Sequence, residues 1–260
     1  MELLPIAFGL LSGVLVGFAL GLVGGGGSIL AVPLMVFVVG VENPHVAIGT
    51  SALAVAANAA MTLANHARRG NVRWRCAAVF AAAGVVGAYG GSTFGKAMDG
   101  QKLLFLFALL MIVVGVLMLR RQDDGGNADA RLDRRNTPKL LGFGAAAGGL
   151  SGFFGIGGGF LIVPGLIAAT GMPMLAAVGS SLLAVTAFGL TTAANYAVSG
   201  LIDWRLAGVF VSGGLIGGML GTALASRLSR SRGALTRVFA ALVFAVAVYM
   251  LYRSGVALAA

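Results

Sequence analysis

Long apolar runs alternate with short polar stretches along the whole chain, and this pattern predicts hydrophobic helical segments. They cover residues 3–23, 29–41, 46–66, 76–95, 103–119, 140–154, 160–170, 174–198, 206–226 and 235–252. A helix needs roughly 20 apolar residues to span the hydrocarbon core of a bilayer. The third, fourth, eighth and ninth segments meet that length, whereas the second and seventh reach only partway across. We therefore expect an all-α polytopic membrane protein in which some helices are short or re-entrant.

Composition supports this fold class and excludes most soluble ones. Hydrophobic residues make up 58% of the chain and charged residues only 10%, and the mean hydropathy is +0.97. A soluble domain carries about 25% charged residues, which this chain lacks. The N-terminus has no basic stretch of the kind found in a signal peptide, so its apolar run is interpreted as the first membrane segment.

The two halves of the chain repeat each other. A set of glycines with Leu30, Val32 and Pro33 recurs 131 positions later, and a second set from Gly49 to Arg75 recurs 130 positions later. The duplication predicts two transmembrane repeats of about five segments each, over residues 1–120 and 140–260. Residues 121–139 between them are too polar to insert and are interpreted as a solvated linker.

The positive charge of the chain predicts how the repeats cross the membrane. The net charge is +10, and Lys and Arg of membrane proteins gather in cytoplasmic loops, so we expect no nucleic-acid partner. If each repeat crosses an odd number of times, one side carries 14 of the 18 Lys and Arg residues, whereas an even number gives 12 and 6. The odd number is favoured, and it makes the tandem repeats inverted relative to each other, a common plan of secondary transporters.

Two glycine-rich stretches are the strongest local signals. Glycine runs form poor helix, at roughly 1 kcal/mol per residue, and unpaired backbone groups in lipid cost several kcal/mol each. Each stretch precedes a short apolar segment whose helix N-terminus could hold an anion. Close packing is the alternative, and we accept it for Gly13, Gly17 and Gly21. The candidate backbone site comprises Gly24, Gly25, Gly26, Gly27, Ser28, Gly155, Gly157, Gly158 and Gly159.

Uncharged polar residues recur at matching places in the third and eighth segments. Hydroxyl and amide groups can replace the lost hydration of an anion without adding charge, although hydrogen bonding between helices is the alternative. We expect the substrate site to be completed by Thr50, Ser51, Asn65, Ser180, Ser181 and Asn195. Asn58 and Thr62 also lie in the third segment, outside this predicted set.

The acidic, histidine and cysteine residues argue against several other functions. None of the eight Asp and Glu residues falls inside a segment, which argues against cationic cargo and against a carboxylate proton relay. His45 and His66 lie at opposite ends of the third segment, and Cys76 is the single cysteine. We therefore expect no metal site, no cofactor and no enzymatic activity.

Taken together, these motifs resemble the TauE/SafE sulfite exporter family of bacterial inner-membrane proteins. The resemblance rests on the duplicated glycine-rich run with its downstream Val-Pro, on Gly-Thr-Ser or Gly-Ser-Ser at the start of the next segment, and on the later Trp-Arg. It implies a multi-pass inner-membrane exporter of a small anion, with sulfite or an organosulfonate such as sulfoacetate as substrate. A passive anion channel and a non-transporting assembly factor stay open as alternatives, as does a homo-oligomer.

Overall fold

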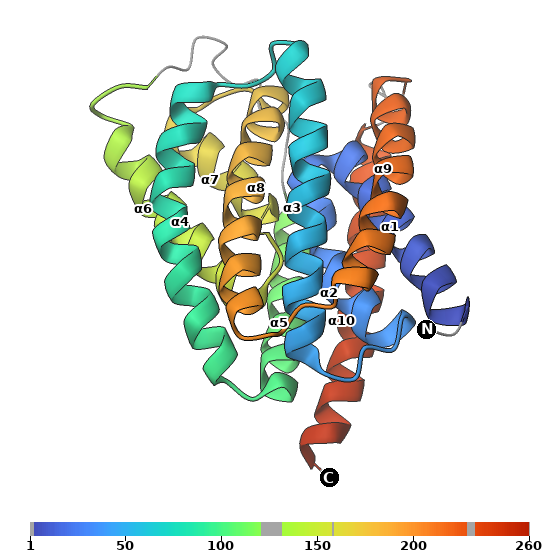
Figure 1. The fold of residues 1–260 in the computed structure, drawn as a ribbon. Helices are drawn as coiled ribbons and strands as arrows, with labels where there is room; N and C mark the ends of the chain where they lie inside the picture. Colours follow the sequence, from blue (N-terminus) through green and yellow to red (C-terminus); the bar gives the residue numbers. More distant parts are fainter. Residues whose placement is uncertain (1–2, 121–131, 158, 228–231, 260) are drawn as a thin grey trace.

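The computed structural model describes residues 3–120, 132–157, 159–227 and 232–259, and all of their regular structure is helical (Figure 1). The elements in chain order are α1 (Leu3–Val23), the 3-10 helix η1 (Gly24–Leu30), the short α2 (Ala31–Pro33), the π-helix η2 (Leu34–Val38), α3 (Pro44–Arg68), α4 (Trp74–Ala97), α5 (Gly100–Arg120), α6 (Thr137–Phe154), α7 (Gly159–Thr170), α8 (Met174–Val198), α9 (Trp204–Arg227) and α10 (Arg232–Ala259). The all-helical fold class is confirmed.

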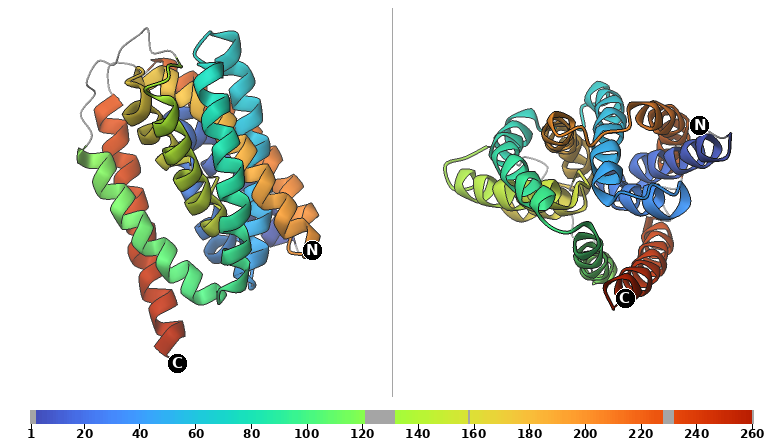
Figure 2. Two further views of the ribbon diagram at one scale, coloured as in Figure 1. Left: turned by 90° about the vertical axis from the view of Figure 1, so that its left-hand side faces the viewer. Right: turned by 60° about the horizontal axis from the view of Figure 1, so that its bottom comes forward.

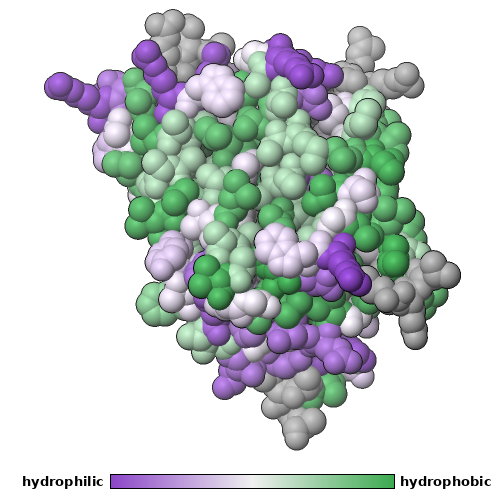
Figure 3. Space-filling model, viewed as in Figure 1, coloured by the Kyte–Doolittle hydropathy of each residue, from purple (hydrophilic) through white to green (hydrophobic). Residues whose placement is uncertain are grey.

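The lengths of the helices follow the hydrophobic pattern. Within the described residues, five helices are long and apolar enough to cross a bilayer: α3, α4, α8, α9 and α5 as far as Leu117. The four spans expected from the sequence are among them, and the apolar helices of residues 27–38 and 161–170 are short, as expected. On the face shown in Figure 3, hydrophobic side chains form a broad band around the middle and hydrophilic ones gather at both ends. The chain is a multi-pass membrane protein.

Local hydrogen bonds set where several helices begin. Asn43 Oδ1 accepts from the His45 amide at the start of α3, where Pro44 occupies the first turn. Asp203 Oδ1 accepts from the amides of Arg205 and Leu206 and caps α9. Such caps satisfy amides that a helix leaves unpaired in its first turn.

The helices pack in pairs that each take one member from each half of the chain. α1 lies along α9, α4 along α6, α3 against α8, and α5 against α10. Figure 2 shows α5 and α10 side by side, on one side of the other helices. α1 and α6 are equivalent helices of the two halves, and so are α4 and α9. The α1–α9 pair therefore corresponds to the α6–α4 pair.

The central helices α3 and α8 run antiparallel. The amide of Asp203, just beyond the end of α8, donates to Thr50 Oγ1 near the start of α3 at 3.0 Å. In the same way the amide of Arg73, just beyond the end of α3, donates to Ser180 Oγ near the start of α8 at 2.8 Å. Each helix therefore begins beside the end of the other.

Glycines bring the backbones of two helix pairs, α1–α9 and α4–α6, into direct contact. An ideal Cβ placed on Gly17 would lie 2.1 Å from the Gly214 carbonyl oxygen, and one on Gly148 would lie 2.0 Å from that of Gly84. Gly13 and Gly21 approach the backbone of α9 equally closely. Small residues allow such close approach between membrane helices. The interpretation of Gly13, Gly17 and Gly21 as packing residues is confirmed.

The basic connections gather at one end of the bundle. The α3–α4 connection, the start of α6 and the end of α9 all lie at the top in Figure 1. Arg68 and Arg69 belong to this end, as do Arg134 and Arg135 just before α6. These basic residues lie at the same end of the bundle, as the distribution of Lys and Arg along the sequence predicted. That this end faces the cytoplasm stays a prediction.

Replacing Gly148 by alanine should destabilise the protein. The added Cβ has no space beside the Gly84 carbonyl oxygen, so α6 must shift away from α4, and overpacking of this kind costs about 1–3 kcal/mol. We expect a lower Tm of the detergent-solubilised protein. Gly90→Ala on α4 is the matched control, because an ideal Cβ at Gly90 has nothing within 4 Å. Equal Tm values for the two variants would contradict backbone contact between α4 and α6.

Candidate functional site

The second glycine-rich stretch forms a true break between α6 and α7. Gly155 and Gly157 have φ angles of +69° and +66°, in the left-handed region that favours glycine. The amides of Gly155 and Ile156 both donate to the Ser151 carbonyl oxygen, which ends α6. The chain resumes helix at Gly159, and Gly158 lies outside the described residues.

This break lies at the centre of the α3–α8 pair. An ideal Cβ on Gly157 would lie 3.0 Å from Val55 Cγ1 and 3.2 Å from Val185 Cγ1. Each valine stands one residue before the middle of its 25-residue helix. Gly155, Gly157 and Gly159 are buried. The irregular backbone is therefore covered by protein, as expected, but its neighbours on α3 and α8 are apolar side chains.

The first glycine-rich stretch takes a different form. Residues 24–30 continue α1 directly as the 3-10 helix η1, and a single turn of α-helix and a π-helix follow. In a 3-10 helix the amides bond to carbonyls three residues earlier, and because η1 follows α1 directly the helix shows no break like the one after α6. Gly27 and Ser28 are buried, and an ideal Cβ on Gly27 would lie 2.4 Å from the Leu20 amide nitrogen. η1 also packs against α7 and α8, which brings the two glycine-rich regions onto neighbouring elements.

The paired hydroxyls on α3 and α8 bond to protein groups. Thr50 and Ser180 accept from the amides of Asp203 and Arg73 as described above, and both side chains are fully buried. The equally buried Ser51 donates to the Ile48 carbonyl at 3.0 Å, and Ser181 donates to that of Val178 at 2.8 Å. Thr50 and Ser180 therefore tie their helices to the segments before α9 and α4, whereas Ser51 and Ser181 bond within their own helices.

Asn195 belongs to a polar cluster centred on Lys96. Lys96 Nζ donates to the carbonyl oxygen and Oδ1 of Asn195 at 2.9 and 2.8 Å, and to Ser199 Oγ at 2.8 Å. Asn195 Nδ2 donates in turn to Ser92 Oγ at 2.6 Å and to Thr93 Oγ1 at 3.0 Å. These acceptors are all uncharged, and the described part of the chain offers Lys96 no carboxylate partner. The sequence did not predict this cluster. The expected fourth segment ends at residue 95 and leaves Lys96 in a loop, whereas α4 continues to Ala97.

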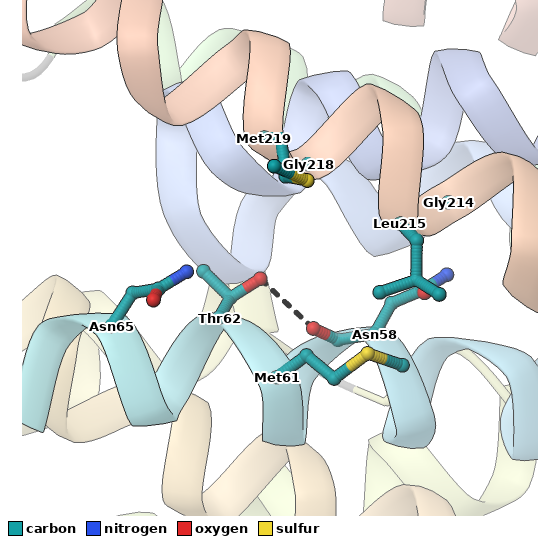
Figure 4. A pocket seen from close by; sticks show the side chains of 8 residues that line it. All are labelled: Asn58, Met61, Thr62, Asn65, Gly214, Leu215, Gly218 and Met219. Atoms are coloured by element: carbon teal, nitrogen blue, oxygen red, sulfur yellow. Dashed lines mark hydrogen bonds between the residues drawn. The ribbon is translucent and has the colours of Figure 1, made fainter.

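Asn65 lies elsewhere, at a hollow between α3 and α9. The hollow has a volume of about 50 Å³ and is lined by Asn58, Met61, Thr62, Asn65, Gly214, Leu215, Gly218 and Met219 (Figure 4). The side chain of Thr62 donates to the Asn58 carbonyl oxygen at 2.8 Å. Asn58 and Thr62 are outside the predicted set.

The structure distributes the predicted site residues over three levels of the bundle. Thr50 and Asn195 lie toward one end, Gly157 lies in the middle, and Ser180 and Asn65 lie toward the other end. The reason is the antiparallel arrangement of α3 and α8, which sends equivalent residues to opposite ends. Only the middle of the two helices allows equivalent residues to meet. A binding role for these residues stays a prediction.

Comparison with known proteins identifies relatives over most of the chain. The sequence profile of the family described as "Sulfite exporter TauE/SafE" matches residues 9–250. A "Probable membrane transporter protein" of Xylella fastidiosa (strain 9a5c) is 56% identical over 250 residues, covering 96% of each chain. The "Probable membrane transporter protein YunE" of Bacillus subtilis (strain 168) is 27% identical over 235 residues, covering 82% of this chain and 85% of its own. No solved structure matches the chain.

Replacing Thr50 by valine should weaken the α3–α9 connection. Valine keeps the shape of the side chain but removes the acceptor of the Asp203 amide, and a lost hydrogen bond of this kind costs about 1 kcal/mol. We expect a lower Tm of the purified protein. Ser212→Ala is the control, because this exposed hydroxyl donates only to the Val209 carbonyl of its own helix. A Tm of Thr50→Val at or above that of Ser212→Ala would contradict the bond.

Proposed function

The chain belongs to the TauE/SafE sulfite exporter family, and we propose that it exports a small anion, sulfite or an organosulfonate such as sulfoacetate, across a bacterial inner membrane. The named relatives are both described as a "Probable membrane transporter protein". The choice of an anion, the outward direction and the substrate class are our proposal.

The observation that carries the proposal is the charge of the membrane region. None of the described helices contains Asp or Glu. Carboxylates inside a membrane mark cation and proton pathways in many transporters. The polar side chains of the helices are instead hydroxyls, amides, histidines and basic groups such as Lys96, all of which can donate hydrogen bonds to an anion. This set of groups favours anionic over cationic cargo.

We also propose that the two repeats are inverted in the membrane. The antiparallel α3 and α8 support this arrangement, as does the exchange of partners between the α1–α9 and α4–α6 pairs. Inverted repeats with irregular helices near the midplane are typical of secondary transporters. The interrupted chain between α6 and α7 lies at that depth of the bundle.

In this proposal the second glycine-rich stretch has the larger part in binding. α7 begins at Gly159, directly after the break, and the first amides of a helix have no partner within it. Together with the helix dipole, such amides favour an anion. The stretch Gly24–Ser28 follows α1 without a break in the helix, so we expect its amides to contribute less.

Lys96 is proposed to hold the anion at the end of the bundle opposite the basic connections, which is the exit end for an exporter. Its ammonium lies 5.9 Å from the centre of the Tyr196 ring and is held by uncharged acceptors, and the described residues form no ion pair with it. A fixed positive charge stabilises an anion that reaches this end.

Flux measurements in liposomes containing the purified protein test the proposal. We expect sulfite to cross faster than in empty vesicles, and inorganic cations to show no protein-dependent flux. Lys96→Met should lower the initial rate at limiting sulfite roughly tenfold. A hydrogen bond from a charged donor contributes about 1.5 kcal/mol, and this energy corresponds to about a tenfold change in rate.

Lys102→Met is the matched control, because Lys102 is exposed near the start of α5. We expect it to transport sulfite at the wild-type rate. An absence of flux of sulfite and of sulfoacetate with the wild-type protein would contradict the proposed function. Equal rates for the two lysine variants would remove the role of Lys96.

A further inference from the structure

The Asn58 side chain is buried and has no hydrogen-bond partner. It is 3% exposed, and neither Nδ2 nor Oδ1 bonds to any described group. A buried polar group left unpaired costs about 1–3 kcal/mol. Native structures keep few such groups, and each requires an explanation.

Asn58 is one of the residues that line the hollow between α3 and α9, near the middle of both helices. Asn58 stands two residues past Ala56, the middle residue of α3. An ideal Cβ on Gly214 would lie 1.9 Å from Asn58 Nδ2, so only glycine at this position of α9 leaves room for the amide. Figure 4 shows Asn58, Thr62 and Asn65 on α3, on the side that faces α9.

The hollow has both polar and apolar walls. Its volume of about 50 Å³ is enough for a few water molecules. Asn58 and Asn65 supply amide groups, whereas Met61, Leu215 and Met219 supply apolar surface. A small ligand with hydrogen-bond acceptors on one side suits these walls.

The equivalent place in the other half of the molecule is filled. Asn58 and Gly214 correspond by the 130-residue repeat to Phe188 and Gly84. The Phe188 ring is fully buried, occupies the space beside Gly84 and stacks on Phe80 with ring centres 6.4 Å apart. Packing beside this glycine is therefore achieved by an apolar ring. The Asn58 amide packs beside Gly214 in the same way but carries a donor and an acceptor that packing does not require, and these unpaired groups point to a ligand.

We propose that the hollow between α3 and α9 is a binding point for the substrate, where Asn58 Nδ2 donates a hydrogen bond to an oxygen of an SO₃ group. This inference rests on the proposed function and names a contact within it. An uncharged amide holds an anion without the strong attraction of a fixed cation, and transport requires release as well as binding. The midplane position is typical of substrate sites in secondary transporters.

The first experiment removes the amide without leaving a void. Asn58→Leu should lower the initial rate of sulfite flux in liposomes at least tenfold at limiting substrate. Its Tm should equal or exceed that of the wild type, because an unpaired buried polar group is lost. Phe188→Leu is the matched control on α8, and it should lower the Tm while keeping the rate per folded protein.

A second pair of variants keeps the test decisive if Asn58→Leu folds poorly. Asn58→Ser and Asn58→Ala leave side chains of nearly equal size, and only serine retains a hydrogen-bond donor. We expect the serine variant to transport several-fold faster than the alanine variant. Measuring both sulfite and sulfoacetate shows which SO₃ compound uses the contact, and slower flux of either one supports the proposal.

The outcomes separate the two proposals. An inactive wild-type protein contradicts the proposed function whatever the variants do. An active wild type, with unchanged KM and maximal rate in Asn58→Leu, overturns the role of Asn58 and leaves the proposed function intact. Equal rates for the serine and alanine variants overturn it in the same way.

Discussion

The antiparallel contact between α3 and α8 is the constraint on which the rest of the structure depends. Gly189 of α8 lies so close to α3 that an ideal Cβ would be 2.9 Å from the Ala56 Cβ. The Thr50 and Ser180 hydroxyls join each end of this pair to the start of α9 or α4. The pair thus fixes which ends of the two halves lie together, and it presents Val55 and Val185 to the break at Gly157.

The outer helices follow from this central pair. The starts of α4 and α9 are held at opposite ends of the α3–α8 pair. Along a face of glycines, α4 then packs against α6, and α9 packs against α1. Backbone contacts such as Gly17 to Gly214 and Gly148 to Gly84 give these pairs little freedom to slide. The two halves still differ at the place that we propose to bind substrate, where Asn58 lines a hollow and Phe188 packs beside the equivalent glycine. We infer that duplication supplied the frame, and that divergence of single residues supplied the substrate contacts.

Much of this fold could be predicted because apolar length and glycine spacing are local properties of the sequence. The first and eighth predicted segments coincide with α1 and α8, and the packing role of Gly17 was evident from its spacing. The candidate site was less predictable, because repeat equivalence shows which residues correspond and not which residues meet. Thr50 and Ser180 correspond but lie at opposite ends of the bundle. Asn58 has no polar counterpart in the second half, so the repeat gave no reason to select it.

Labelling of single cysteines from each side of the membrane tests the antiparallel α3–α8 arrangement most directly. With Cys76 replaced by alanine, Arg68→Cys and Val198→Cys place one thiol at the end of α3 and one at the end of α8, on exposed equivalent positions. A membrane-impermeant thiol reagent should label the two from opposite sides, with position 68 on the cytoplasmic side. Labelling of both from the same side would contradict inverted repeats and the pathway built on them.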